Sequence, residues 1–242
     1  MSQAAPAFPP APSDPCCCGA DATFEGCCGS RASDRLAPKG LILVENAIDP
    51  GLRERLLAEA ERRGGERFRG LDYVPGTLRD SVEVDETTFY ERVKLEDMRS
   101  ELDGFVGEAF TRLVAQAYGA RLDWYEEPKL LRYRPGGQFG PHADGAIIDP
   151  VSSRWKKTKD RDLSFLVYLD DEFTGGALSF PYFHYRLKPQ AGLLVLFPSD
   201  IRFLHAAEPV ESGVRHAIVS WASVQGVPKL HPEPPPHAIR VN

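Results

Sequence analysis

Six short segments rich in β-branched and aromatic residues follow one another in the second half of the chain. They read "PKLLRY", "LSFLVYLDD", "GALSF", "YRLKP", "GLLVLFPS" and "RHAIVSWASV", and Gly, Pro or Asp residues separate them. Short strands at this spacing, bounded by turn residues, are typical of a β-sandwich or barrel. The spacing therefore predicts an all-β core over residues 121–226.

A helical support is predicted ahead of this core, over residues 40–120. A strand over 40–48 precedes Asp49-Pro50, which has the N-cap and first-turn Pro of a helix start, and Gly64-Gly65 ends that helix. Apolar residues at helical spacing predict a second, longer helix over 89–118, with Gly119 as its C-cap. Together with the β core, these helices predict an α+β protein.

The two ends of the chain differ from its centre in composition. Residues 1–39 are rich in Ala, Pro, Ser, Gly and Cys and are predicted to be a disordered tail, and residues 227–242 a Pro-rich C-terminal tail. All five cysteines fall in the first tail, at Cys16, Cys17, Cys18, Cys27 and Cys28. A flexible tail and a soft-metal or redox site both remain open for this cluster, but a disulfide scaffold is excluded because the core has no cysteine.

Composition excludes some classes of function. The 242 residues are 42% hydrophobic and 26% charged, as in ordinary globular proteins, and the net charge is −6. An acidic chain is a poor match for nucleic acid, which needs a basic face. No apolar run reaches the length of a membrane span, and no secretory signal pattern is present, so we expect a cytoplasmic protein without a membrane partner. The oligomeric state stays open.

The stretch "RYRPGGQFGPHADG", residues 132–145, places His142 two residues before Asp144. In a strand, residues i and i+2 point to the same face, so an imidazole and a carboxylate would lie side by side. A third ligand must come from elsewhere, and His205 in "FLHAAEPVESGVRHAIVSW" is the candidate. Arg215 follows ten residues later, and a hairpin at "ESG" would return it close to His205. Two His and one Asp on one face of Fe(II) would leave positions open, with an Arg ready for an anion.

These segments, taken in order, resemble the prolyl-4-hydroxylase-like 2-oxoglutarate- and Fe(II)-dependent oxygenases. The resemblance runs over residues 128–224 and rests on the combination of "YRPGGQFGPHADG", "LSFLVYLDD", "GGALSFP", "LKPQAGLLVLF" and "LHAAEPVESGVRHAIVSW". It implies a double-stranded β-helix, also called a jelly-roll or cupin-like core, within an oxygenase domain over residues 40–226.

The resemblance also implies roles for individual residues. His142, Asp144 and His205 would be the iron ligands, and Arg215 would bind the distal carboxylate of 2-oxoglutarate. Tyr133 would hydrogen-bond the cosubstrate, and Trp221, which has the strand parity of Arg215, would face the barrel interior; a purely packing role stays open for both aromatic residues. The implied cofactors are Fe(II), 2-oxoglutarate and O2, with ascorbate as the reductant. By contrast, parity predicts that His216 points outward and is not a ligand.

The implied activity is hydroxylation of an aliphatic C–H bond with release of succinate and CO2. The first expectation for the substrate is a prolyl or other side chain of a peptide or protein. A free amino acid or small natural product is the alternative, and a metal-binding or sensory module without turnover is the alternative of another class. The polar, basic segment 146–162, directly after the His-x-Asp pair, is either a substrate lid or a solvated loop.

Overall fold

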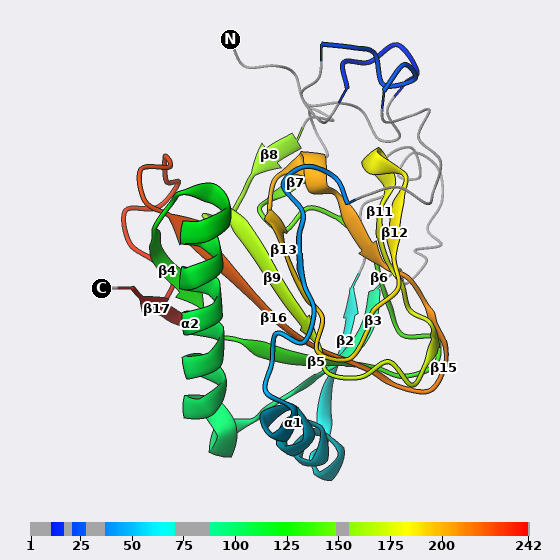
Figure 1. Ribbon diagram of the computed structural model, residues 1–242, viewed down its shortest axis with the longest axis vertical. Coiled ribbons are helices and arrows are strands. Elements are labelled where there is room, and N and C mark those ends of the chain that lie inside the picture. Colours follow the sequence, from blue (N-terminus) through cyan, green and yellow to red (C-terminus); the bar gives the residue numbers. More distant parts are fainter. Residues whose placement is uncertain (1–10, 17–20, 28–36, 71–87, 149–154, 242) are drawn as a thin grey trace.

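The computed structural model of the protein describes residues 11–16, 21–27, 37–70, 88–148 and 155–241 (Figure 1). Its two α-helices are α1 (Pro50–Arg62) and α2 (Arg99–Tyr118), and its 3-10 turns are η2 (Glu96–Met98), η3 (Pro181–Phe183) and η4 (Ile201–Phe203). The strands are β1 (Ile42–Val44), β2 (Gly65–Gly70), β3 (Thr88–Val93), β4 (Leu122–Glu126), β5 (Lys129–Tyr133), β6 (Gln138–His142), β7 (Ala146–Ile148), β8 (Trp155–Lys157), β9 (Leu163–Tyr168), β10 (Thr174–Gly175), β11 (Leu178–Phe180), β12 (Tyr185–Leu187), β13 (Leu194–Pro198), β14 (His205–Ala207), β15 (Val210–Ser212), β16 (Arg215–Val224) and β17 (Ala238–Arg240).

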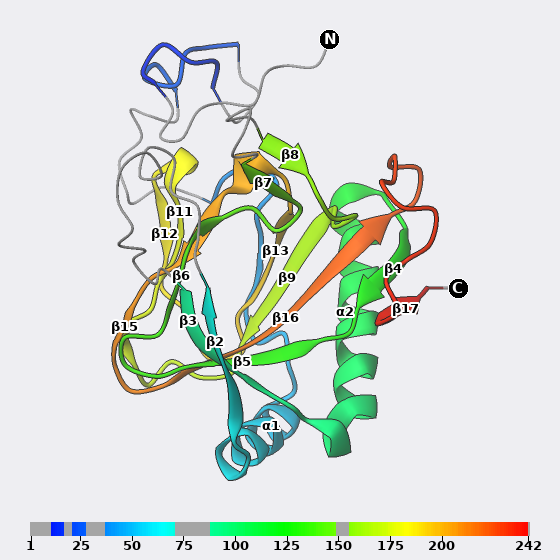
Figure 2. The same cartoon turned by 180° about the vertical axis from the view of Figure 1, so that it is seen from behind.

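One long antiparallel sheet organises the fold. Its strand order is β1-β13-β9-β16-β5-β3-β6-β14-β11-β12, with β2 added to β3, β4 to β16 and β17 to β4. The sheet curls, so that β6, β11 and β14 form one wall of an opening and β5, β9 and β16 form the other (Figures 1 and 2). This arrangement confirms the predicted α+β class with a jelly-roll core.

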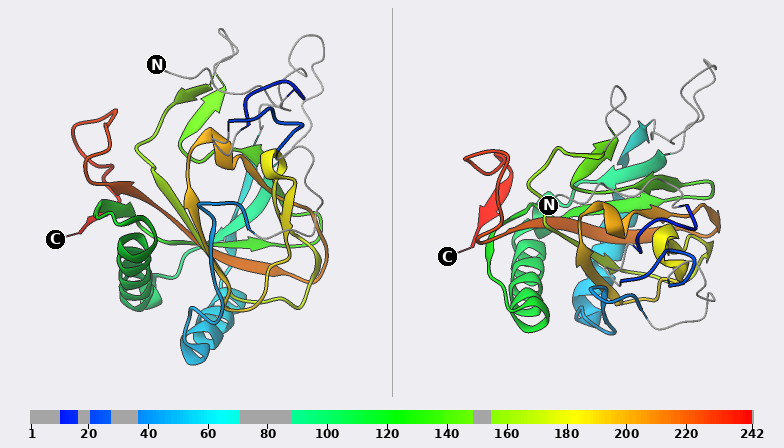
Figure 3. Two further views of the ribbon diagram at one scale, coloured as in Figure 1. Left: turned by 45° about the horizontal axis from the view of Figure 1, so that its top comes forward. Right: turned by 90° about the horizontal axis from the view of Figure 1, so that it is seen from above.

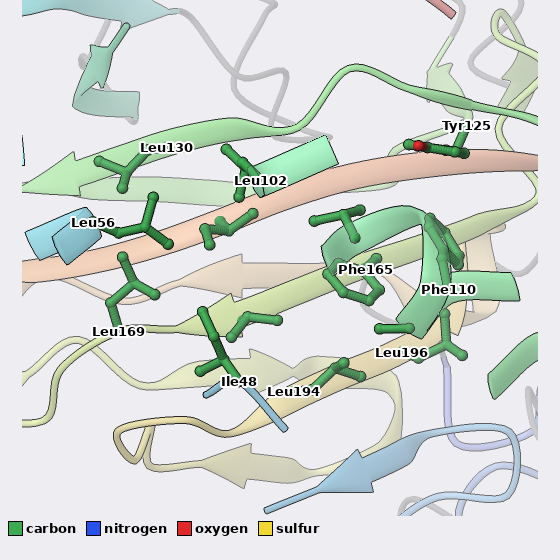
Figure 4. Close-up of a cluster of buried hydrophobic side chains, with 14 of the residues drawn as sticks. Ile48, Leu56, Leu102, Phe110, Tyr125, Leu130, Phe165, Leu169, Leu194 and Leu196 are labelled. Carbon is green, nitrogen blue, oxygen red and sulfur yellow. The ribbon is translucent and has the colours of Figure 1, made fainter. Parts of the chain in front are cut away.

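Strand alternation divides the side chains between two cores. On β16, Ile218 and Ala222 point to the helices, whereas Ala217 and Val219 point into the opening. Figure 4 shows the helix-side core, in which side chains of α1, α2 and the strands interleave; the labelled residues are Ile48, Leu56, Leu102, Phe110, Tyr125, Leu130, Phe165, Leu169, Leu194 and Leu196. The helices therefore support the β core from behind and leave the opening free.

Helix α1 follows the predicted signals. Asp49 accepts a hydrogen bond from the backbone N–H of Leu52 at 2.9 Å, Pro50 occupies the first turn, and the helix ends at Arg62, just before the Gly64-Gly65 pair. Gly119 caps α2 in the left-handed conformation, at φ 61°.

The predicted start of the second helix is wrong. Residues 88–93 form strand β3, and α2 begins only at Arg99. The segment "TFYERV" contains two β-branched and two aromatic residues, which favour a strand, and its backbone pairs with β2, β5 and β6. The sheet pairing prevailed over the apolar spacing that had suggested a helix, because β3 closes the gap between β5 and β6. Helix α2 itself is continuous through Gly107, where any Cβ would come within 2.6 Å of the Tyr125 hydroxyl.

The C-terminal segment is in contact with the core. Strand β17 pairs with β4 at the edge of the sheet, and the backbone N–H groups of Leu230 and His231 donate to the Asp160 carboxylate at 2.7 and 3.0 Å. Figure 3 shows this segment beside β4. The division of the chain at residues 39 and 226 stays a prediction, and much of the predicted N-terminal tail lies outside the described residues. No helix in the described ranges combines the length and apolar character that a bilayer span requires.

Candidate active site

Three predicted ligands meet at one wall of the opening. His142 is the last residue of β6, Asp144 lies in the turn that follows, and His205 begins β14, whose ladder pairs His205 with His142. One ligand atom from each of the three lies within 4.8 Å of the others. Each imidazole Nε2 is 3.6 Å from an oxygen of the Asp144 carboxylate. Asp144 therefore reaches the site from a turn and not, as strand parity assumed, from the strand itself.

The two imidazoles are held in matching orientations. The Nδ1 atom of His142 lies 2.8 Å from the carbonyl oxygen of Gly140, and that of His205 lies 3.0 Å from the carbonyl oxygen of Phe203. An Nδ1–H that donates to a carbonyl fixes the tautomer and leaves Nε2 with a free lone pair. The His142 ring also stacks on Phe139, with ring centroids 3.8 Å apart. Both Nε2 atoms are thus presented to the same point in space.

The Asp144 carboxylate is buried and ionised. Burial alone would raise its pKa, but the charges and hydrogen bonding of His205 and His142 hold the pKa of Asp144 well below its usual range. Burial and the neighbouring His142 lower the pKa of His205 to about 4, so this imidazole is neutral at pH 7. The Ser164 hydroxyl donates to the Asp144 carboxylate at 2.6 Å and fixes its orientation. A carboxylate and neutral imidazoles are the protonation states that a metal ion requires.

Arg215 lies in the same cavity but on the opposite wall. It is only 1% exposed, and its Nη1 donates to the carbonyl oxygen of Gly176 at 2.5 Å. Gly176 has φ +61°, which presents that carbonyl from a left-handed turn. The Nε and Nη2 groups of Arg215 have no hydrogen-bond partner among the described residues. Two buried N–H groups of this guanidinium are therefore available to donate hydrogen bonds to a bound anion.

The predicted hairpin between His205 and Arg215 is wrong, although the two residues do share a cavity. Strand β14 pairs with β6 and β11, whereas β16 pairs with β4, β5 and β9. The chain crosses between the walls after β15, where Gly213 has φ +77°. His205 and Arg215 are close because the sheet curls, not because they are ladder partners.

Tyr133 lies beneath the guanidinium of Arg215. The centre of the guanidinium is 4.0 Å from the Tyr133 ring centroid, and the two residues are direct cross-strand partners. Burial raises the pKa of Tyr133 above its usual range, so the phenol stays protonated and can donate a hydrogen bond. The structure thus places Tyr133 beside Arg215, and its contact with a cosubstrate stays a prediction.

Trp221 also lines the cavity, as its shared parity with Arg215 predicted. Its ring lies beneath the guanidinium of Arg161, 3.7 Å away, and the ammonium of Lys129, 4.8 Å away. His216 occupies the other face of β16 and takes no part in the triad. It is not exposed, however: it is 3% accessible, and its ring bonds the Asp170 carboxylate at 2.5 Å.

Sequence reasoning missed two residues of the site. Ser164 and Tyr168 both lie on β9, in the segment "LSFLVYLDD", with the parity of the cavity face. Tyr168 is buried beside Arg215, and burial raises its pKa to about 12. The antiparallel register of β9 and β16 places Tyr168 opposite Ala217 and Ser164 opposite Trp221. Knowledge of that register would have identified Ser164 and Tyr168 as residues of the cavity face. The sequence gives no such register by itself.

The donor set fits an Fe(II) ion and an anionic cosubstrate. Two imidazoles and one carboxylate on one side of a point leave the other side open, which is the arrangement of the facial triad. The orphaned N–H groups of Arg215 fit a carboxylate, which a guanidinium binds through parallel hydrogen bonds. The cavity that contains both measures about 550 Å³, which is enough for a small cosubstrate and part of a substrate.

Comparison with known proteins agrees with this chemistry. Residues 128–223 match the family described as the 2OG-Fe(II) oxygenase superfamily. A PKHD-type hydroxylase of Klebsiella pneumoniae (strain 342) is 39% identical over 98 residues, 39% of this chain and 41% of the relative. Another, from Synechococcus elongatus, is 41% identical over 97 residues, 37% of this chain and 40% of the relative. The match thus spans about two fifths of these curated relatives.

Solved structures share the fold. A viral collagen prolyl hydroxylase from Paramecium bursaria Chlorella virus-1, in its 2OG complex, superimposes with a TM-score of 0.54 at 20% identity, over 77% of this chain and 97% of that one. A prolyl hydroxylase from Trichoplax adhaerens, in complex with a hypoxia inducible factor peptide fragment, gives 0.56 at 17% identity, over 76% and 84%. Residues 128–223, which form most of the β core, thus match the 2OG-Fe(II) oxygenase superfamily, and the chain shares the fold of these solved structures.

Proposed function

We propose that the protein is a 2-oxoglutarate-dependent Fe(II) dioxygenase that hydroxylates an aliphatic C–H bond. His142, Asp144 and His205 would hold the iron, and Arg215 would bind the distal carboxylate of 2-oxoglutarate. One observation carries this proposal above the others. A His-Asp-His cluster, with Asp144 and His205 buried and His142 half-buried, shares a cavity with a buried arginine that has two N–H groups without a partner among the described residues.

The chemistry that iron, 2-oxoglutarate and O2 supply when bound is hydroxylation of an unactivated C–H bond, with succinate and CO2 as the other products. The protein's own contribution is to orient and to exclude water. Gly140 and Phe203 fix the two imidazoles, Ser164 fixes the Asp144 carboxylate, and the apolar residues that line the cavity would help to exclude water once a substrate is bound.

The two aromatic residues would complete the cosubstrate site. The protonated phenol of Tyr133, next to Arg215, is placed to donate a hydrogen bond to the same carboxylate. Trp221 would form a wall of the cavity nearer to the iron ligands, because the Arg161 that covers its ring also approaches the carbonyl oxygen of Asp144, at 3.5 Å. Ascorbate belongs in the assay as the reductant that the family resemblance implies.

For the substrate, we propose first a prolyl or other side chain of a peptide or protein. The names of the similar proteins support this choice, since they include PKHD-type hydroxylases, a collagen prolyl hydroxylase and a prolyl hydroxylase that binds a peptide fragment. The catalytic unit would comprise residues 40–226, with the helices of residues 40–120 supporting the β core of 121–226. The segments 1–39 and 227–242 would be appendages to it.

Anaerobic titration tests the proposal. Adding Fe(II) and 2-oxoglutarate to the purified full chain should give the weak visible charge-transfer band of a 2-oxo acid bound to iron, and O2 should then release succinate. His142→Ala and Asp144→Ala should abolish both signals. His184→Ala is the matched control, because His184 is an exposed histidine outside the triad. A folded protein that binds Fe(II) but gives neither band nor succinate would instead be a non-catalytic metal-binding module.

A further inference from the structure

Four cationic side chains line one side of the cavity. They come from neighbouring elements: Arg92 from β3, Lys129 from β5, and Lys159 and Arg161 from the loop between β8 and β9. Two of them, Lys129 and Arg161, lie over the ring of Trp221 of β16. We call these four residues the cationic row.

The cationic row is only partly neutralised by the protein. The Glu126 carboxylate accepts from Arg161, with Nη2 to Oε2 at 2.8 Å, and pairs with Lys129 at 3.2 Å. Arg92 and Lys159 have no ion-pair partner among the described residues. Lys159 is exposed overall, and partial desolvation of its ammonium together with the positive charge of Arg161 lowers its pKa. Burial lowers the pKa of Lys129, with Arg161 and Arg92 adding to the effect. The four cations therefore lie close enough to repel one another, and an added anion would relieve that repulsion.

The cationic row is distinct from the cosubstrate clamp. Trp221 lies six residues along β16 from Arg215, which corresponds to roughly 20 Å of strand. One molecule the size of 2-oxoglutarate cannot reach both. The row lies instead near the iron ligands, because Arg161 approaches the carbonyl oxygen of Asp144 at 3.5 Å. An anion bound there would position the rest of its molecule beside the triad.

We propose that the cationic row binds a carboxylate of the substrate. This inference rests on the proposed function and narrows its substrate class to molecules with a carboxylate close to the hydroxylated carbon. Lys159 and Arg92 would supply the main contacts because neither forms an ion pair within the described part of the chain, and Glu126 would keep Arg161 and Lys129 in place. The carboxylate can be that of a free amino or carboxylic acid or that of an acidic residue in a peptide.

Two pairs of probes test the inference and separate these sources. The first pair is L-proline and L-prolinamide; the second is a capped Glu-Pro peptide and its Gln-Pro counterpart. Binding is measured by ligand-observed NMR on the full chain loaded anaerobically with Fe(II) and 2-oxoglutarate, so no turnover is needed. The charge-transfer band, recorded on the same sample, reports separately on the proposed iron and cosubstrate site.

The wild-type protein should prefer the carboxylate of one pair over its amide by about tenfold, as expected for a charge-assisted contact. Lys159→Gln or Arg92→Gln should remove that preference and leave 2-oxoglutarate affinity unchanged. Lys156→Gln is the control, because Lys156 is exposed on β8 and does not line the cavity; it should retain the preference. A preference in the first pair identifies a small acid, and one in the second pair identifies an acidic peptide. Equal binding of both members in both pairs, or weaker 2-oxoglutarate binding in Lys159→Gln, would overturn the inference.

Discussion

Replacement of Arg215 by methionine should abolish cosubstrate binding and leave the free protein about as stable as before. Arg215→Met removes one charged hydrogen bond, to Gly176, and the contact with the Tyr133 ring. Together these contribute about 2–4 kcal/mol to folding. The replacement also removes two buried N–H groups without partners, each of which costs about 1–3 kcal/mol. At the midpoints of these ranges, about 3 and about 4 kcal/mol, the opposing contributions nearly cancel, so the free energy of unfolding should change little.

Cosubstrate binding responds differently because both free N–H groups would then be in use. Two charge-assisted hydrogen bonds at about 1.5–3 kcal/mol each imply at least about 100-fold weaker binding of 2-oxoglutarate in the variant. At a concentration 100 times the wild-type Kd, 2-oxoglutarate should stabilise the wild-type protein by about 2.7 kcal/mol and the variant by about 0.4 kcal/mol. Denaturant unfolding with and without 2-oxoglutarate measures both quantities.

Arg132→Met supplies a matched comparison on the adjacent strand β5. Arg132 is also buried, but its partners are complete: it pairs with Glu91 at 2.6 Å and donates to the carbonyl oxygen of Ala60 at 2.7 Å. Its loss leaves the buried Glu91 poorly compensated and should cost about 3 kcal/mol of stability, with 2-oxoglutarate affinity retained. If Arg215→Met destabilised the free protein as much as Arg132→Met, or bound 2-oxoglutarate normally, the reasoning from the orphaned N–H groups would be refuted.

Three further predictions concern the surroundings of the site. Ser164→Ala removes the hydroxyl that holds the Asp144 carboxylate, and it should weaken Fe(II) affinity about 10- to 100-fold without unfolding the protein, as metal titration followed by the charge-transfer band would show. The pKa of Glu126 is lowered from 4.5 to about 2, because the pairing with Arg161 outweighs the effect of burial. The ionised carboxylate therefore stabilises the protein above pH 4.5, and this stability, about 3 kcal/mol in all, is lost as the pH falls towards 2. Glu126→Gln should flatten the pH dependence of the free energy of unfolding in that window, and a curve identical to that of the wild type would contradict the ion pair. Gly107→Val should destabilise the protein by more than about 2 kcal/mol, because the new side chain would meet the Tyr125 hydroxyl at 2.6 Å, whereas Gly104→Val, with open space around it, should change the unfolding midpoint little.

Local signals in the sequence predicted the parts of the fold that local chemistry decides. Asp49-Pro50 starts α1 and Gly119 ends α2, because a cap depends on a few consecutive residues. The strands of the β core were recognisable for the same reason, from short segments rich in β-branched and aromatic residues between turns. The start of α2 could not be predicted, because the apolar residues of 88–93 fit the spacing of a helix as well as that of a strand. The neighbouring strands β2, β5 and β6 decided in favour of a strand.

The site divides in a similar way. His142, Asp144, His205 and Arg215 were predicted from their spacing and residue types to bind a metal and an anion, and the structure brings all four to one cavity. The arrangement of these residues in space could not be predicted from the sequence. The sheet had to curl before the wall carrying the triad faced the wall carrying Arg215, and the predicted hairpin gave a different reason for their proximity.

The sequence alone thus determined which side chains can bind a metal and an anion, because that capacity belongs to the residue types and their order along the chain. The tertiary structure decided which groups lie without partners and which elements meet. The Nε and Nη2 groups of Arg215 lack partners because the described elements packed around it offer a single acceptor, the carbonyl oxygen of Gly176, which Nη1 uses. The cationic row exists only because β3, β5 and the loop after β8 border the same cavity, with Lys129 and Arg161 over the Trp221 ring. Contacts between residues so far apart in the chain follow from strand register, which no local pattern specifies.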